Sequence, residues 1–398
     1  MIGGSNCSPT GKLLVATRVY GAQGQPWMRR QVEALQAWER RLVCWKCHRN
    51  PDHEQLALDV LPYPVAPYDG RGRWWHRLKA LPGGNLYAAQ GAERGALEKI
   101  LTREKPAVLL CYFGDIAMRV LPVANKCGIP VVAYLHGDFQ FASNRWYRMS
   151  LLNTLDQFKA VVTVTEKERD WIRGKAPQYE NLHVIPCGAP TGLFLPSRVR
   201  DGTSLCCAMA SRLSKEKGCH ISIKAFAMLH AEDPNARLHI FGDGPARPTL
   251  TALVEDLGLR AHVIFHGYVS EDELAHRLPA CDVFLQHSLK KEGSPVSIVE
   301  AMSCALPIVA TRVGGIVDQV DHGRTGFLVE QEDLSGMIQG MRKLASSATL
   351  RKEFGEAGRQ RAIQLFDSDR LSKRLDEVLR SVGTHHSSNM GVDLVLSE

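Results

Sequence analysis

The chain of 398 residues contains no long uncharged apolar run. The longest one near its middle, residues 128–135, is far shorter than the roughly 20 residues that a helix needs to cross a bilayer. No segment with the pattern of a secretory signal opens the sequence. We therefore expect an intracellular globular protein without a membrane-spanning helix.

Cysteine patterns typical of a disulfide framework are also missing. The 11 cysteines are odd in number, and they stand inside apolar runs, as Cys111 and Cys281 do, or side by side, as Cys206 and Cys207 do. Small secreted domains instead carry an even set at regular spacings. The cysteine usage therefore predicts a reducing compartment, and we expect a cytoplasmic location.

A convincing metal site is lacking as well. Residues 44–48 have the Cys-x-x-Cys-His spacing of a covalent haem site and half that of a zinc ribbon, but no second cysteine pair completes a ligand set. Asp367 and Asp369 match an Asp-x-Asp metal motif, yet they precede a stretch rich in Leu and Arg, where Asp and Ser are common helix caps. We predict no metal, no cofactor, and a helix start at this point.

What the sequence does contain is a repeated pattern of strand, loop and helix. Hydrophobic residues make up 44% of the chain, and its length exceeds the usual size of one core. Short apolar runs are typical of strands in a parallel sheet that is covered on both faces. The clearest such runs are residues 13–16, 107–112, 131–135, 161–164 and 205–209.

The same pattern predicts the domain organisation. Chain-breaking residues are frequent between Pro186 and Ser197, so we place a domain boundary at about 190–202. The prediction is an α/β protein with two doubly wound, Rossmann-like domains at 1–195 and 203–366. A final helix at 367–384 is expected to return to the first domain.

Two carboxylates frame the most informative stretch of the sequence. Glu292 lies in a predicted tight loop, and Glu300 lies about one turn inside the helix that follows. Unpaired N–H groups at a helix start suit a phosphate or sugar oxygens, and carboxylates beside them can accept hydrogen bonds from hydroxyl groups. An ordinary buried helix with one capping and one solvated glutamate would have the same pattern. The loop and helix start comprise Gly293, Ser294, Pro295 and Val296.

A second group of polar residues follows the predicted strand at 205–209. Arg212 and Lys217 lie in the loop between that strand and the next helix, at the sheet edge where open parallel sheets bind ligands. Two cations there can stabilise the negative charge of a departing diphosphate. A solvated basic turn is the simpler interpretation of this loop taken alone.

Together these motifs resemble those of the family 4 glycosyltransferases. Residues 292–315, followed by 323–329, are similar to the donor-site signature of that family, and residues 210–218 are similar to its diphosphate motif. The resemblance implies the GT-B fold, in which two Rossmann-like domains face each other across a cleft. It also implies a nucleotide-sugar donor and transfer with retention of anomeric configuration. Bacterial enzymes of exopolysaccharide assembly show the nearest pattern.

The resemblance implies roles for individual residues. Glu292 would be catalytic, because it would hold donor-sugar hydroxyls and support charge at the anomeric centre, and His136 would orient the sugar from the first domain. Arg212 and Lys217 would bind the diphosphate, and Glu300 would bind the ribose hydroxyls. Further donor-binding residues would be Gly293, Ser294, Pro295, Val296, Gly244, Tyr268 and Val269.

Charge is distributed unevenly along the chain. Up to residue 195 there are 25 Lys and Arg against 16 Asp and Glu, and beyond it 24 against 26. Aromatic residues beside Arg and Lys in this basic half favour peripheral contact with an anionic membrane surface, at its cytoplasmic face. Core-facing aromatic residues would give the same pattern. The residues concerned are Trp74, Trp75, Trp146 and Tyr147.

These observations predict transfer of a hexosyl unit from a nucleoside-diphosphate sugar to a hydroxyl group of a glycan or lipid-linked acceptor, in polysaccharide biosynthesis. Two alternatives are a nucleotide-sugar epimerase of similar fold and a non-catalytic protein that binds sugar nucleotides. The epimerase needs acid and base groups around the sugar ring that the sequence does not identify. The non-catalytic protein would not need both glutamates and both cations.

Overall fold

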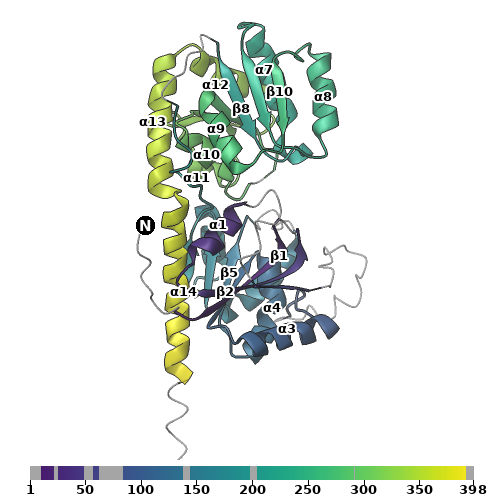
Figure 1. Ribbon diagram of the computed structural model, residues 1–398, viewed down its shortest axis with the longest axis vertical. Helices are drawn as coiled ribbons and strands as arrows, with labels where there is room; N and C mark the ends of the chain where they lie inside the picture. The colour runs from purple at the N-terminus through teal and green to yellow at the C-terminus, as the bar shows by residue number, and fades with distance from the viewer. Residues whose placement is uncertain are drawn as a thin grey trace, which may run out of the picture. The chain divides into compact units, whose positions relative to one another are not determined.

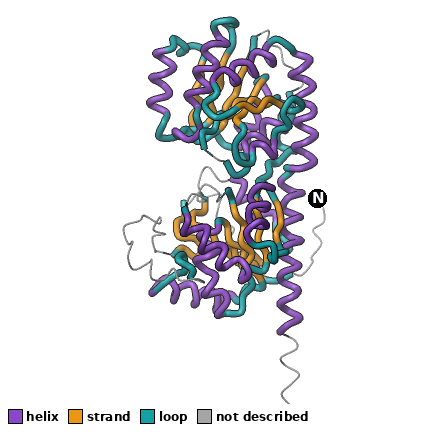
Figure 2. The backbone as a smooth tube through the Cα atoms, turned by 180° about the vertical axis from the view of Figure 1, so that it is seen from behind, coloured by secondary structure: helices purple, strands orange, loops and turns teal. Residues whose placement is uncertain are grey.

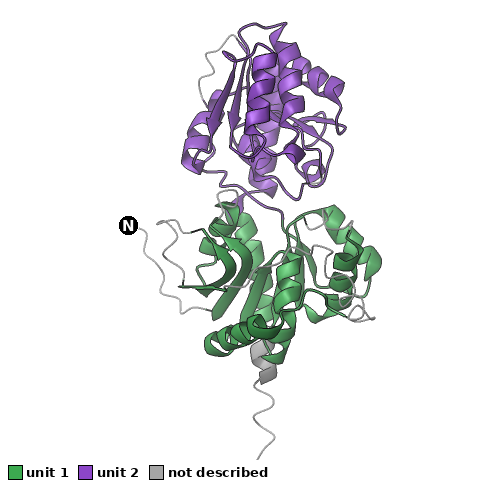
Figure 3. Cartoon of the chain, turned by 90° about the vertical axis from the view of Figure 1, so that its right-hand side faces the viewer, with its two compact units in different colours: residues 1–185, 369–398 green, residues 186–368 purple. Residues whose placement is uncertain are grey.

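The computed structural model describes residues 10–21, 26–48, 57–61, 84–137, 144–197, 204–290 and 292–390. The chain forms two compact units (Figure 1, Figure 3). The first unit comprises residues 1–185 and 369–398, and the second comprises residues 186–368. Each unit contains its own parallel sheet, with helices packed against the strands (Figure 2).

A seven-stranded sheet forms the centre of the first unit, in the order β3-β2-β1-β4-β5-β6-β7, with all neighbours parallel. Its strands are β1 (Lys12–Tyr20), β2 (Glu39–Cys47), β3 (Ala57–Val60), β4 (Val108–Tyr112), β5 (Val131–Leu135), β6 (Ala160–Thr163) and β7 (Leu182–Val184). Its helices are α1 (Pro26–Ala34), α3 (Gly91–Glu104), α4 (Gly114–Lys126), α5 (Arg145–Thr154), η4 (Leu155–Gln157), α6 (Glu166–Lys175) and α14 (Ser368–Met390). Every residue of β4, β5 and β6 is buried, as expected for uninterrupted apolar strands.

A six-stranded sheet forms the centre of the second unit, in the order β10-β9-β8-β11-β12-β13, again with all neighbours parallel. Its strands are β8 (Cys206–Ala210), β9 (Arg237–Phe241), β10 (Val263–Gly267), β11 (Val283–Gln286), β12 (Ile308–Thr311) and β13 (Gly326–Val329). Its helices are η5 (Lys215–Lys217), α7 (Cys219–His230), α8 (Arg247–Asp256), α9 (Glu271–Arg277), η6 (Leu278–Ala280), α10 (Val296–Ser303), α11 (Ile316–Gln319), α12 (Leu334–Ala345) and α13 (Ala348–Leu365).

Alternate residues of the second sheet point into two separate cores. Ala208 and Phe284 belong to the core that includes side chains of α9, α10 and α13. Cys207 and Leu285 belong to the core that includes side chains of α7, α8 and α12. Both faces of the sheet are covered, which explains why its strands are almost continuously apolar. The predicted α/β fold with two Rossmann-like, parallel-sheet domains is confirmed.

The chain enters the second unit earlier than the sequence predicts. The predicted first domain extends to residue 195, but the compact units divide between Ile185 and Pro186. The cause is packing of the segment that follows, because Phe194 is fully buried in a core of the second unit. The backbone of Ala189 also exchanges hydrogen bonds with Phe366 and Ser368, at 3.1 and 2.9 Å.

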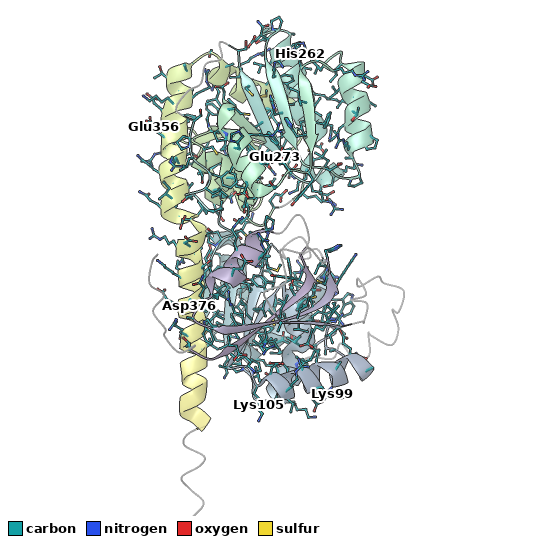
Figure 4. All side chains as sticks on the ribbon, in the orientation of Figure 1. Lys99, Lys105, His262, Glu273, Glu356 and Asp376 are labelled. Atoms are coloured by element: carbon teal, nitrogen blue, oxygen red, sulfur yellow. The ribbon has the colours of Figure 1, made fainter. Side chains whose placement is uncertain are left out.

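The last helix, α14, packs on the first unit. Its apolar residues Leu371, Leu375 and Leu379 are buried. Figure 4 labels Asp376 on this helix, and its Oδ1 accepts a hydrogen bond from Trp38 Nε1 at 2.7 Å. Within the part of the chain that the structure describes, no helix combines the length and the apolar character that crossing a membrane requires.

Candidate functional site

The strand order of the second sheet reverses at β8, whose neighbours are β9 and β11. Such a switch point leaves a crevice at the carboxyl ends of the strands, where open α/β sheets bind ligands. The loop after β8 carries Arg212 and Lys217, and the loop after β11 carries Glu292. The topology therefore brings two groups of predicted residues to one point.

A glycine brings these two loops into close contact. Gly218 follows η5 with φ 58°, and a Cβ atom at this position would lie 2.0 Å from the backbone oxygen of His287. Only glycine fits this approach, because any side chain would collide with backbone. The turn that carries Lys217 can therefore lie directly against the end of β11.

Lys217 and Glu292 form an ion pair at this junction. Lys217 Nζ lies 2.7 Å from Oε1 and 2.9 Å from Oε2 of Glu292, although the two residues are 75 positions apart. Their side chains are 23% and 16% exposed. The side chain of Arg212 is exposed nearby in sequence. The structure thus brings a predicted diphosphate ligand and the predicted catalytic carboxylate together.

Ser288 also contacts this carboxylate, and the sequence prediction missed it. Its Oγ donates to Glu292 Oε1 at 2.7 Å and accepts from Gln286 Nε2 at 3.1 Å. Ser288 is fully buried, and Thr311 Oγ1 accepts from its backbone N–H at 3.0 Å. A polar Gln-x-Ser sequence at the carboxyl end of an apolar strand was the available signal, because open parallel sheets bind ligands at that end.

The loop from Glu292 to Pro295 is held by the loop after β12. Gly315 N donates to the backbone oxygen of Glu292 at 2.9 Å, and Gly314 has φ 52° with no room for a Cβ atom, which would lie 1.9 Å from the same oxygen. Gln319 Nε2 donates to Ser294 Oγ and to the oxygen of Pro295, both at 3.1 Å. The sequence prediction missed Gln319 because its contacts depend on tertiary packing.

Helix α10 begins directly after this loop. Val296 is its first residue, and Pro295 is its N-cap, with φ −65° and no side chain that could accept a hydrogen bond. Gly293, Ser294, Pro295 and Val296 are all partly exposed, whereas Glu300 in the second turn is only 6% exposed. The helix start and both glutamates therefore belong to one local structure, as predicted.

The β9–α8 loop lies against the loop that carries Arg212. Leu213 N donates to Asp243 O and Ala246 N donates to Leu213 O, each at 2.9 Å. A Cβ atom on Gly244 would lie 2.4 Å from Leu213 O, so glycine is required there by close approach. Asp243 also accepts from Gly244 N at 2.7 Å, and this bond is the main cause of the lowered pKa of Asp243.

The two remaining predicted donor-binding residues follow β10. Tyr268 is 54% exposed, and Val269 is half-buried against a core of the second unit. Because β9 separates β10 from β8 in the sheet, these residues lie farther from the switch point than Arg212 does. The position of Tyr268 and Val269 suits contact with the end of an extended ligand that lies away from the switch point.

His136 follows β5 in the first unit and lies in an aromatic cluster. Its ring centroid is 4.1 Å from that of Tyr134, 4.4 Å from Trp27, 5.3 Å from Tyr112 and 5.4 Å from Phe113. The residue is 9% exposed, and burial lowers its pKa to about 3. At neutral pH the imidazole is therefore uncharged and can both donate and accept a hydrogen bond.

The structure describes both motifs that the sequence analysis sets aside as metal sites. Cys44 and Cys47 lie in β2, and burial raises the pKa of Cys44 to about 12. Asp367 Oδ2 accepts from Thr191 Oγ1 at 2.6 Å, and α14 begins at Ser368, so the predicted helix start is confirmed. Among the described residues, no three His, Cys, Asp or Glu side chains are grouped to hold a metal ion.

The structure corrects part of the predicted membrane-facing aromatic group. Tyr147 is 4% exposed and belongs to the core of the first unit, where its ring packs edge-on against Tyr87 with centroids 5.6 Å apart. Trp146 is half-buried. Amphipathic rings beside basic residues occur in cores as well as at membrane surfaces, and here packing decides for the core. Trp74 and Trp75 lie outside the described residues.

Two family models match consecutive parts of the chain. One described as "Glycosyltransferase Family 4" matches residues 30–193, and one described as "Glycosyl transferases group 1" matches residues 196–361. The chain belongs to the family 4 glycosyltransferases. The two matches divide near the predicted domain boundary.

The names of curated relatives agree with this family, and a solved structure agrees with the fold. The chain is 29% identical over 287 residues to the GDP-mannose-dependent alpha-(1-6)-phosphatidylinositol monomannoside mannosyltransferase of Mycolicibacterium smegmatis, covering 67% of this chain and 75% of that protein. It is 29% identical over 211 residues to the colanic acid biosynthesis glycosyltransferase WcaL of Salmonella typhimurium, covering 51% of this chain and about half of that protein, 52%. The crystal structure of HepE from Anabaena in complex with UDP and glucose superposes with a TM-score of 0.74 at 19% identity, covering 93% of this chain and 100% of that one. The predicted GT-B fold is confirmed.

Proposed function

We propose that this glycosyltransferase moves a hexosyl unit from a nucleoside-diphosphate sugar to a hydroxyl group of a glycan or lipid-linked acceptor, with retention of anomeric configuration, in polysaccharide biosynthesis. The observation that carries the proposal is the ion pair of Lys217 and Glu292 at the switch point of the second sheet. In the proposed site, this pair would set a cation for the leaving group beside a carboxylate for the sugar. The relatives, which are named as transferases, favour this function over epimerisation or binding alone.

In this proposal the ammonium of Lys217 serves two groups. A lysine ammonium has three N–H donors, so it can keep a bond to Glu292 while it donates to a diphosphate oxygen. Charge that develops on the leaving diphosphate would be stabilised where it forms. The exposed Arg212 would contribute a second cation, and the start of α10 would add backbone N–H groups from Val296 onward.

Glu292 would accept hydrogen bonds from sugar hydroxyls and stabilise positive charge at the anomeric carbon. Ser288 and Lys217 hold the carboxylate in place for that role. Glu300 lies in the second turn of α10 and is 6% exposed. Its carboxylate would bind the ribose hydroxyls. Backbone groups of Gly244, Tyr268 and Val269 would contact the base.

His136 would orient the donor sugar from the first unit as a neutral imidazole. Because burial lowers its pKa to about 3, it would contribute hydrogen bonding rather than charge. We further propose that catalysis needs no metal ion, since two cations and a helix start already serve the diphosphate. Peripheral membrane contact at the cytoplasmic face remains part of the proposal, on the strength of the basic first half of the chain.

A panel of nucleotide sugars tests the function directly. GDP-mannose, UDP-glucose and UDP-N-acetylglucosamine would be incubated with the full chain, and slow donor hydrolysis and thermal stabilisation would be measured. We expect one donor to give both signals. Release of an isomerised nucleotide sugar would instead indicate an epimerase, and stabilisation without any turnover would indicate a binding protein.

Two glutamine variants test the assigned roles with this donor. Glu292→Gln should reduce hydrolysis about 100-fold or more, on the scale of one lost transition-state contact, while nucleotide affinity stays close to that of the wild type. Glu300→Gln should act mainly on nucleotide affinity, measured by calorimetry. The reverse pattern would mean that the two carboxylates exchange roles.

A further inference from the structure

Two thiols meet at the amino ends of β8 and β11. Sγ of Cys206 lies 3.5 Å from Sγ of Cys281. The sheet register fixes this contact, because the two strands are parallel neighbours with Val283 opposite Cys207. Asp282 N donates to Cys206 O at 2.7 Å, and Asp282 Oδ2 accepts from Cys206 N at 2.9 Å. Backbone structure therefore holds the two sulfur atoms together.

Two histidines extend this thiol pair. His239 lies on the neighbouring strand β9, and its side chain interacts with Cys206 so as to lower the pKa of that thiol. Its Nδ1 lies 2.9 Å from Nε2 of His266, and the two rings stack with centroids 5.1 Å apart. His266 Nδ1 lies 3.3 Å from Arg277 Nη1, which ends the chain of polar contacts at the surface.

These contacts make the two thiols chemically different. The interactions with Cys281 and His239 lower the pKa of Cys206, against the opposing effects of burial and of Asp282. The contact with Cys206, together with burial, raises the pKa of Cys281. Cys206 is half-buried, whereas Cys281 is 2% exposed. A partly exposed thiol with a lowered pKa beside a buried thiol with a raised pKa is the arrangement of an attacking and a resolving cysteine.

We propose that Cys206 and Cys281 form a redox-modification site, which a hydroperoxide converts reversibly into a disulfide. The Cys206 thiolate attacks one peroxide oxygen, so an S–O bond forms, the O–O bond breaks, and the leaving oxygen takes a proton. Sγ of Cys281 then attacks the resulting sulfenic acid. The S–S bond forms, the S–O bond breaks, and the released hydroxide takes the Cys281 proton to give water.

Two electrons pass from the thiols to the peroxide in this reaction, and a dithiol reductant returns them by thiol–disulfide exchange. The two cysteines lie at the amino-terminal ends of the strands, and the candidate donor site lies at the carboxyl-terminal ends. This follows because β8 and β11 are parallel and lead from the cysteines toward Lys217 and Glu292. Disulfide formation would therefore tie the two central strands together without occupying the donor-binding residues.

Peptide mass spectrometry of the full chain tests the site. The protein would be reduced, freed of reductant, exposed to hydrogen peroxide and blocked with N-ethylmaleimide. We expect a peptide that links Cys206 to Cys281, lighter by two hydrogen atoms than the reduced pair and lost after dithiothreitol. Cys207→Ser is the matched control, since the neighbouring Cys207 points into the opposite core, and it should still form the link.

Cys206→Ser and Cys281→Ser should not form the link. A disulfide through Cys207 would overturn the proposal. So would oxidation of Cys206 to a sulfinic acid while Cys281 still reacts with the maleimide after unfolding. The thiol variants are expected to keep donor hydrolysis in reducing buffer, because neither cysteine belongs to the donor site.

A kinetic measurement keeps the proposal testable if the Cys281 variant fails to fold. Alkylation of Cys206 by iodoacetamide should be about tenfold slower at neutral pH in His239→Gln, because less of the thiol is ionised. His262→Gln is the matched control, since the ring of His262 contacts that of His230 in a tilted arrangement and takes no part in the polar contacts of Cys206. Equal rates in the two variants would overturn the assigned role of His239.

Discussion

Removal of the Lys217 ammonium would show whether the ion pair with Glu292 belongs to a nucleotide site. Nζ lies 2.7 and 2.9 Å from the two carboxylate oxygens, in a position where both side chains are mostly buried. In the proposed complex the same ammonium also donates to the diphosphate. A hydrogen bond between charged groups contributes about 1.5–3 kcal/mol. Lys217→Ala should therefore weaken nucleoside-diphosphate binding about 10- to 150-fold.

Part of the weaker nucleotide binding of Lys217→Ala comes from the carboxylate of Glu292, which loses its cationic partner. Without Lys217, the carboxylate of Glu292 keeps only the hydrogen bond from Ser288 among these contacts and would repel an anionic ligand. The double variant Lys217→Ala/Glu292→Gln should therefore bind nucleoside diphosphate more tightly than Lys217→Ala alone. Residues in direct contact typically show coupling energies of about 0.5–3 kcal/mol.

Calorimetric titration with UDP and with GDP measures these affinities, and a thermal melt of each variant confirms folding. Lys215→Ala is the matched control, because this exposed lysine belongs to the same short helix and carries the same charge. If Lys217→Ala and Lys215→Ala weaken nucleotide binding equally, the effect comes from the loss of net positive charge and not from the ion pair. Strictly additive effects of Lys217→Ala and Glu292→Gln would refute a shared ligand site.

Three further changes probe the same structure. Ser288→Ala removes the bond to Glu292 Oε1 and should lower turnover about tenfold or more with nucleotide affinity unchanged, while Ser288→Thr restores it; an equal loss in affinity, measured by calorimetry, would argue for a general packing defect. Gly314→Ala and Gly258→Ala both place a side chain at positive φ, which costs about 1–2 kcal/mol, but only Gly314 faces backbone within 2 Å, so only its variant should lose nucleotide binding in the calorimeter. Burial lowers the pKa of His136 from 6.5 to about 3, so the unfolded chain binds a proton that the folded chain does not between these values. The stabilisation from neutral His136 is complete above about pH 6.5 and is lost as the pH falls toward 3, so denaturant titrations of wild type and His136→Gln should converge in that direction; a constant difference would mean a solvated imidazole.

The fold was predictable from the sequence because strands that are buried on both faces consist of nearly continuous apolar residues. The strands β4, β5 and β6 are uninterrupted apolar runs, and a chain that repeats strand, loop and helix has few alternatives to a parallel sheet. The domain boundary was less predictable. Prolines and glycines mark where regular structure ends, but they do not reveal that Phe194 packs into the second unit.

The candidate site also had a part that could be predicted from the sequence and a part that could not. Glu292 and Lys217 could be named from local motifs, since each stands at a loop that follows an apolar strand. Their contact could not, because a separation of 75 residues is closed only by the register of β8 beside β11. The prediction that Tyr147 faces a membrane was wrong for a related reason. Aromatic rings beside basic residues give the same sequence pattern in a core and at a membrane surface, and only the packing distinguishes them.

Close approach of backbone to backbone shapes the loops of the candidate donor site, namely those after β8, β11 and β12. Gly218 lies against the backbone of His287 from the loop after β8, and Gly314 lies against the backbone of Glu292 from the loop after β12. The segment between β11 and α10 is thus clamped by the loops of both neighbouring strands. A clamped backbone, with Ser288 on the carboxylate, leaves Glu292 little freedom to move. In the proposed donor complex, Lys217 would be the partner that adjusts, because its flexible chain could turn the ammonium toward the diphosphate while the carboxylate of Glu292 stays in place for the sugar.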